Sequence, residues 1–228
     1  MVVLTDEDFP LRWGDTIPNE AFKGRKDITK VCIPSRIRKI WYGAFWGCSG
    51  LTDLRFPDTL TEIGHGSFRG CSGLAELRLP ETLTKIGDFA FYGCYGLTVI
   101  RLHGTLTVIG NGAFWGCSGL TELRLPDTLT VIGEEAFREC SGLTELRFPD
   151  TLTEIGDGSF EGCSGLTELR LPGLIESLGA EAFYKCTSLR NLSMHSIIQF
   201  ECSNYDNTYH QFNGCTSLKA IYAPPEVS

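Results

Sequence analysis

The sequence has few histidines, no long apolar run and no excess of basic residues. Its 228 residues include 20 Lys and Arg against 28 Asp and Glu, which gives a formal net charge of −8. Because a protein needs a basic face to bind phosphates, this balance disfavours a nucleic acid partner. No segment approaches the roughly 20 apolar residues of a membrane-spanning helix, so we expect no membrane insertion.

A signal peptide is also missing from the start of the chain. The first residues, MVVLTDEDFPLRW, are acidic and contain neither a basic segment nor a long apolar core. This start favours a cytoplasmic location. A cell-surface or secreted location remains the alternative for a chain whose signal has been removed.

Groups typical of catalysis or metal binding are scarce. No Ser occupies a nucleophile elbow, and no glycine-rich phosphate loop occurs. Cys202, His210 and Cys215 have a spacing that fits no usual zinc site. We therefore expect no enzyme activity, no metal and no cofactor. The four histidines lie in different parts of the chain: His65, His103, His195 and His210.

The sequence instead contains a repeat of 23 residues. Residues 115–137 and 138–160 are identical at 16 of 23 positions. A short fixed period is typical of a solenoid, in which each unit packs only on its neighbours. The repeated aromatic residues are Phe22, Phe45, Phe68, Phe91, Phe114, Phe137, Phe160 and Phe183, and Phe212 follows after 29 residues.

Most cysteines follow the same period. A buried unpaired Cys behaves as a small apolar residue, so we expect a column of free thiols and no disulfide framework. Cys32 and Cys202 lie outside the column. Its members are Cys48, Cys71, Cys94, Cys117, Cys140, Cys163, Cys186 and Cys215.

Each repeat predicts a short strand followed by a turn and a return path. In residues 114–136 the alternation of apolar and charged residues predicts a strand with Glu122 and Arg124 facing solvent. Gly133 is expected to have a positive φ, and a short helical turn is expected directly after it. Nine parallel strands are predicted, beginning near Ile28, Leu51, Leu74, Leu97, Leu120, Leu143, Leu166, Leu189 and Leu218.

The pattern LxxLxLPxxLxxIGxxAFxxC resembles the BspA-like class of leucine-rich repeat, from about Ile17 to Pro224. The resemblance implies an α/β solenoid. In this fold a curved right-handed coil carries a parallel concave β-sheet of about nine strands and short helical or irregular segments on the convex side. It also implies a non-enzymatic protein that attaches to other proteins or to surfaces.

The period also divides the chain into parts. We expect an N-terminal cap at residues 1–16, leucine-rich repeats at 17–194, an inserted loop at 195–211, and the last repeat with the C-terminal end at 212–228. The open edge of the last strand is a candidate for self-association.

Departures from the period suggest where a partner binds. The predicted sheet carries a column of acids beside a column of arginines, which either keeps the surface soluble or binds a ligand. Val99 interrupts the acids and is expected to leave Arg101 without its acidic neighbour in the column, beside His103 and a small apolar patch. We expect a protein partner, of unknown identity, on the concave sheet and at the C-terminal end. The candidate residues are Arg78, Val99, Arg101, His103, Arg124, Asn191, Tyr205, Tyr209 and Tyr222.

Other functions stay open. Two columns of Thr in the DTLT segments resemble the ladders of ice-binding solenoids, although Thr is also common in turns where its hydroxyl bonds backbone. The chain could also be a structural spacer or an engineered, consensus-like repeat scaffold. Trp46, Tyr92 and Trp115 lie in one further column, where we expect partial burial against adjacent repeats.

Overall fold

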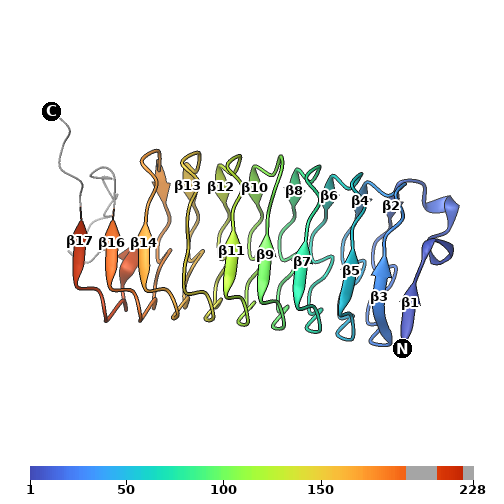
Figure 1. Cartoon of the computed structure of the whole chain (residues 1–228), viewed down its shortest axis with the longest axis horizontal. Helices are drawn as coiled ribbons and strands as arrows, with labels where there is room; N and C mark the ends of the chain where they lie inside the picture. The colour runs from blue at the N-terminus through green and yellow to red at the C-terminus, as the bar shows by residue number, and fades with distance from the viewer. Residues whose placement is uncertain (194–209, 223–228) are drawn as a thin grey trace.

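The computed structural model describes residues 1–193 and 210–222. The chain winds into a parallel β-solenoid whose turns lie side by side in one row from the N-terminus to the last strand (Figure 1). No α-helix occurs within the described residues, where the helical segments are short 3-10 turns. These turns are Asp6–Asp8, Leu11–Trp13 and His210–Phe212.

One side of the solenoid carries the strands that the repeat predicts, together with β1, which precedes the repeats and was not predicted. They form three sheets, ordered β1-β3-β5, β7-β9-β11 and β14-β16-β17. The strand predicted near Leu143 is reduced to a bridge between Arg147 and Arg170. The strands are β1 (Val2–Leu4), β3 (Ile28–Cys32), β5 (Asp53–Arg55), β7 (Glu76–Arg78), β9 (Val99–Arg101), β11 (Glu122–Arg124), β14 (Glu168–Arg170), β16 (Asn191–Ser193) and β17 (Ala220–Tyr222).

The return paths of the turns form a further, eight-stranded sheet, which the sequence did not predict and which we call the second sheet. Its eight strands have only two residues each, and the second residue is apolar and faces the core. Ile132, for example, pairs with Ile109 of the preceding turn. The strands are β2 (Thr16–Ile17), β4 (Lys39–Ile40), β6 (Glu62–Ile63), β8 (Lys85–Ile86), β10 (Val108–Ile109), β12 (Val131–Ile132), β13 (Glu154–Ile155) and β15 (Ser177–Leu178).

A stack of phenylalanine rings forms the centre of the core. From Phe22 to Phe212 the centroids of consecutive rings lie 5.0–5.4 Å apart, and the planes are nearly parallel. At the N-terminal end Phe9 packs edge-on against Phe22, with 5.5 Å between the centroids. The stack therefore continues into the segment that precedes the repeats.

The column of cysteines bonds each turn to the one before it. Each thiol of this column donates to the carbonyl of a Phe in the preceding turn, at 3.1–3.4 Å. The expectation of free thiols is confirmed, since all nine described cysteines are free. Cys202 lies outside the described residues. The repeated Cys thus provides both small apolar volume and a donor for a backbone carbonyl.

The turn after the second sheet differs from the expectation in two ways. Residues 134–139 form hydrogen-bonded turns and no helix. The positive φ falls on Glu135, at 54°, and not on Gly133. Gly133 is needed for another reason, because a Cβ there would lie 2.5 Å from Asn111 Oδ1 and 2.9 Å from Asn111 N. Close approach to the preceding turn, and not φ, requires this glycine.

Candidate functional site

The strands of the first side present two columns of charged side chains, which we call the Glu/Arg face. The register of the strands places Arg78, Arg101 and Arg124 directly beside one another. Like charges in register repel each other unless opposite charges lie nearby. The acids of the face are Asp53, Glu76, Glu122, Glu145 and Glu168, and its arginines are Arg55, Arg78, Arg101, Arg124, Arg147 and Arg170.

Ion pairs within single strands offset this repulsion over much of the face. The Nε of Arg78 lies 2.9 Å from Glu76 Oε1, and the Nε of Arg124 lies 2.9 Å from Glu122 Oε1. The arginine side chains are 77% and 67% exposed. Exposed pairs contribute only about 0–1 kcal/mol each, so they leave these side chains available to a partner.

Arg101 is paired differently from its neighbours in the column. Val99 does remove the acid from its strand, but Arg101 Nε lies 3.5 Å from Glu122 Oε1 on the next strand. Arg101 therefore lacks the acid of its own strand, and its nearest acid is on the adjacent strand. His103 is exposed just after β9, and no hydrogen bond or ion pair links it to Arg101 in the described part of the chain.

The candidates at the C-terminal end are separated from those on β7–β11. Asn191 Nδ2 donates to Glu168 Oε1 at 3.2 Å. Strand β16 pairs with β17, where Asn191 is in register with Ala220 and Ser193 with Tyr222. Tyr205 and Tyr209 lie outside the described residues. The interruption at residues 145–147 lies between the two groups of candidates.

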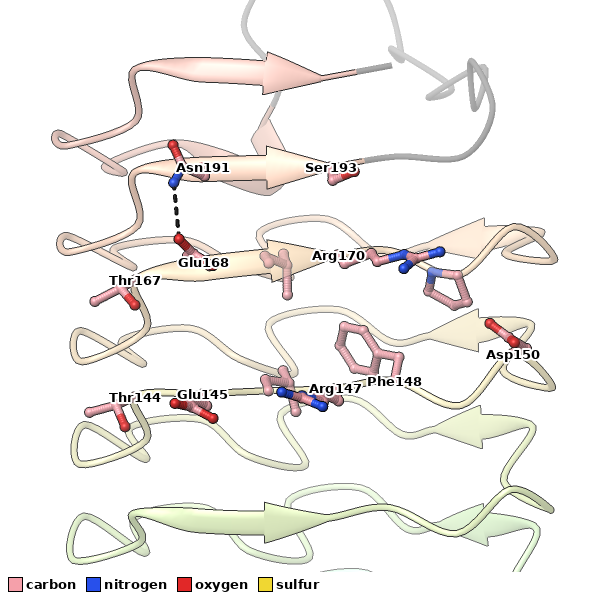
Figure 2. Close-up of a pocket in the computed structure, with 13 residues that line it drawn as sticks. Thr144, Glu145, Arg147, Phe148, Asp150, Thr167, Glu168, Arg170, Asn191 and Ser193 are labelled. Atoms are coloured by element: carbon pink, nitrogen blue, oxygen red, sulfur yellow. Dashed lines mark hydrogen bonds between the residues drawn. The ribbon is translucent and has the colours of Figure 1, made fainter. Parts of the chain in front are cut away.

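A groove of about 720 Å³ lies at this interruption (Figure 2). In Figure 2 Glu145 and Glu168 lie toward one side of the groove, Arg147 and Arg170 lie nearer its middle, and Asp150 lies at the opposite side. Of the residues that line this groove, the sequence predicted only Asn191 as a site residue. The lining also includes Glu145, Arg147, Phe148, Glu168, Arg170 and Pro172.

The interruptions of the sheet coincide with a change of one core residue. The residue after the arginine is Leu79, Leu102, Leu125 or Leu171 in four turns but Phe56 and Phe148 in two. Strand β5, next to Phe56, does not pair with β7, and the strand next to Phe148 is nearly lost. Both rings stand edge-on against the phenylalanine stack, with 5.6 Å between centroids. The larger ring accounts for the local loss of strand pairing.

Most hydroxyls of the Thr columns donate to backbone carbonyls of the preceding turn. Thr128 Oγ1 donates to the carbonyls of Gly104 and Leu106 in the preceding turn, at 2.9 and 2.8 Å. Thr82 and Thr151 make the equivalent pairs of contacts. A hydroxyl whose proton is shared with backbone is not free to order a water lattice. This geometry disfavours the ice-binding alternative.

The aromatic column is interleaved with cations. The guanidinium of Arg69 lies 5.1 Å from the ring of Trp46 and 4.5 Å from the ring of Tyr92, and that of Arg138 lies 5.0 Å from Trp115. Trp46, Tyr92 and Trp115 are half-buried, as expected. Because arginines cover their faces, these rings stabilise the flank and offer little area for a stacked ligand.

Neither a membrane-spanning helix nor a metal cluster is found in residues 1–193 and 210–222. No helix there is long and apolar enough to cross a membrane. No group of three or more His, Cys, Asp or Glu side chains in this part of the chain is arranged to hold a metal ion.

Comparison with solved structures identifies bacterial leucine-rich repeat proteins. A leucine-rich repeat protein from Bacteroides ovatus is 29% identical with a TM-score of 0.69, and the match covers 90% of this chain and 58% of that one. A leucine-rich repeat protein from T. pallidum is 34% identical with a TM-score of 0.64, over 66% of this chain and 71% of that one. A third leucine-rich repeat protein, from Eubacterium ventriosum, shares the fold at 20% identity with a TM-score of 0.54. That match covers 91% of this chain and 63% of the other.

The chain thus spans less than two-thirds of the length of the Bacteroides ovatus protein. No curated protein sequence matches it. The model of the BspA type leucine rich repeat region, in six copies, matches residues 15–142 and 107–228. The period, the parallel solenoid and this match agree, and the chain belongs to the BspA-type leucine-rich repeat family.

Proposed function

We propose that the chain is a non-enzymatic binding module that recognises a protein partner through the Glu/Arg face and the adjoining C-terminal strands. The observation that carries this proposal is the face itself. Short parallel strands hold exposed charged side chains at fixed spacing, over a core of stacked rings and buried thiols.

Such a surface is suited to binding because its side chains are already arranged before the partner arrives. A partner then loses little free energy to ordering of the module, and the affinity depends on how well its charges match the columns. The half-buried Val99 and the paired Arg101 provide a local departure within an otherwise regular pattern. Arginine is also enriched at the energetic centres of protein interfaces.

The test is capture of cross-linked partners from a lysate of the producing cell, with three forms of the chain. The first is the unchanged protein, and the second carries Arg101→Glu and Arg124→Glu on the face. The matched control carries Lys39→Glu and Lys85→Glu, which make the same change in charge on the second sheet.

We expect the same partner to be captured by the unchanged chain and the control and to be lost from the face variant. Capture of the same proteins by all three forms would contradict binding through the Glu/Arg face. Folding of each variant is checked by circular dichroism, since all four side chains are at least partly exposed.

A further inference from the structure

The groove at the interrupted strand contains two arginines without an ion-pair partner among the described residues, whereas the arginines of β7 and β11 are paired. In β7 and β11 each arginine is paired with the acid of its own strand, at 2.9 Å. In the two turns that line the groove, neither Arg147 nor Arg170 lies within ion-pair distance of a carboxylate of the described residues. Both side chains are exposed.

The two free arginines are direct neighbours. Arg147 and Arg170 form the bridge that remains of the lost strand, so their backbones are in parallel register. The backbones of equivalent residues in adjacent parallel strands lie about 4.8 Å apart, so two long arginine side chains that start there can reach one common group. A carboxylate placed between the two guanidinium groups would accept charge-assisted hydrogen bonds from both.

Two acids of the groove, Glu145 and Glu168, restrict the charge that a ligand can place beside them. Both lie two residues before the arginines, toward one side of the groove (Figure 2). Glu168 accepts one hydrogen bond from Asn191, and Glu145 has none from the described residues. A wholly acidic ligand would be repelled by these two carboxylates, whereas a basic group there would be attracted.

Apolar surface completes the groove beyond the arginines. Phe148 is half-buried against Phe160 and Phe183, at 5.6 and 6.5 Å between centroids, and Pro172 also lines the groove. In an extended peptide, side chains two positions apart face the same side. Two such side chains would match the spacing of Glu145 and Arg147 in the groove.

We propose that this groove binds an extended segment of a partner protein in which a basic residue and an acidic residue are two positions apart. The acidic side chain bridges Arg147 and Arg170, and the basic side chain faces Glu145 and Glu168. This inference rests on the proposed function, because it names the partner chemistry for one part of the Glu/Arg face.

The experiment titrates short capped peptides into the isotope-labelled chain at low salt and follows its amide signals by NMR. One peptide carries Lys-x-Glu in a Ser and Val background, and three matched peptides carry Glu-x-Glu, Lys-x-Lys or Ser-x-Ser at the same places. We expect saturable shifts at residues 145–150 and 168–172 with the Lys-x-Glu peptide and much weaker binding of the other three.

A pair of variants tests the arginines. Arg147→Ala with Arg170→Ala should weaken binding of the Lys-x-Glu peptide about tenfold or more, because two charge-assisted hydrogen bonds are lost. Lys39→Ala with Lys85→Ala removes two exposed cations of the second sheet, neither of which lines the groove, and should change the affinity less than about twofold.

Absence of saturable shifts with the Lys-x-Glu peptide would overturn the inference, and so would an equal loss of affinity in both pairs of variants. Equal binding of the Glu-x-Glu peptide would show that the acids of the groove play no part, which also contradicts it. These failures differ from failure of the proposed function, which is measured by partner capture with Arg101 and Arg124 changed.

Discussion

The guanidinium of Arg101 shares the carboxylate of Glu122 with Arg124. Its Nε lies 3.5 Å from Glu122 Oε1, while the Nε of Arg124 lies 2.9 Å from the same oxygen. Two arginines depend on one acid because Val99 occupies the place where the neighbouring strands have Glu76 and Glu122.

An acid at position 99 should relieve this sharing. We expect Val99→Glu to have a free energy of unfolding about 0.2–1 kcal/mol higher than Val99→Gln, since only the glutamate pairs with Arg101. Both variants lose the same buried part of Val99, so the comparison isolates the charge. Urea denaturation measures the difference, and equal stabilities at low salt would contradict it.

The thiols of the cysteine column should be unreactive in the folded protein. Burial raises the pKa of Cys117 and that of Cys163 to about 12, and the thiolate is the reactive form. Cys32 is only half-buried. At pH 8 iodoacetamide should label Cys32 well before Cys117, and in urea both should react at similar rates. Mass spectrometry of quenched samples measures labelling, and early modification of Cys117 without urea would refute this expectation.

Removal of one column thiol should destabilise the solenoid. Cys117 is fully buried, and its thiol donates to the Phe91 carbonyl at 3.4 Å. Cys117→Ala should lower the free energy of unfolding by about 1–3 kcal/mol, from the lost donor and the small cavity. Cys32→Ala is the control and should change it by less than about 0.5 kcal/mol. Equal effects of the two changes on the urea midpoint would count against a structural role for the column.

Glu139 occupies a position that most repeats give to glycine. Its φ is 60°, and Gly47, Gly70, Gly116 and Gly162 have φ between 72° and 75° at the equivalent place. A non-glycine residue there costs about 1–2 kcal/mol, so Glu139→Gly should stabilise the chain by about 0.5–1 kcal/mol after the entropy of glycine is counted.

The reverse change provides the control for Glu139. A Cβ at Gly116 would meet no atom closer than 3.6 Å, so Gly116→Glu should destabilise the chain through its φ alone. Thermal melts of both variants measure the two effects. A lower melting temperature for Glu139→Gly would show that its weak contact with Trp115 Nε1, at 3.4 Å, outweighs the strain.

Asp27 should titrate at an unusually low pH. The side-chain hydrogen bonds from Arg25, at 2.7 and 2.8 Å, lower the pKa of Asp27 from 3.8 to about 2. The folded pKa is below the unfolded one, so the associated stabilisation is present above pH 3.8 and is lost as the pH falls toward 2. Arg25→Ala should return the pKa of Asp27 toward 3.8 in a carboxyl NMR titration, and an unchanged value would refute the assignment of cause.

The repeat alone predicts the stacking, the outward charges and the free thiols, because a core built from one repeated residue set admits few packings. The second sheet was missed because Leu129 and Ile132 are three residues apart, and strands of two residues leave no alternation to detect. The φ of Gly133 was misjudged for a related reason. Glycine is required there by the preceding turn, which a single repeat does not contain.

The groove was missed because its residues look regular in the sequence. Glu145 and Arg147 repeat the Glu and Arg of their neighbours, and Phe148 replaces the Leu of four other turns, as Phe56 also does. The size of that ring shows its effect only where strands must lie side by side. The partner of Arg101 could not be foreseen either, because long side chains reach the next turn as easily as their own.

The thiol-to-carbonyl bonds and the ring stack join each turn only to the adjacent turns, which has a consequence for spacing. Deleting residues 115–137 would bring Cys140 into the place of Cys117, where it would donate to the Phe91 carbonyl. The distance between Arg101 and the groove would then shorten by one strand spacing, about 4.8 Å, with both ends unchanged. The number of turns between two contact points therefore sets their separation along the solenoid, in steps of one strand spacing.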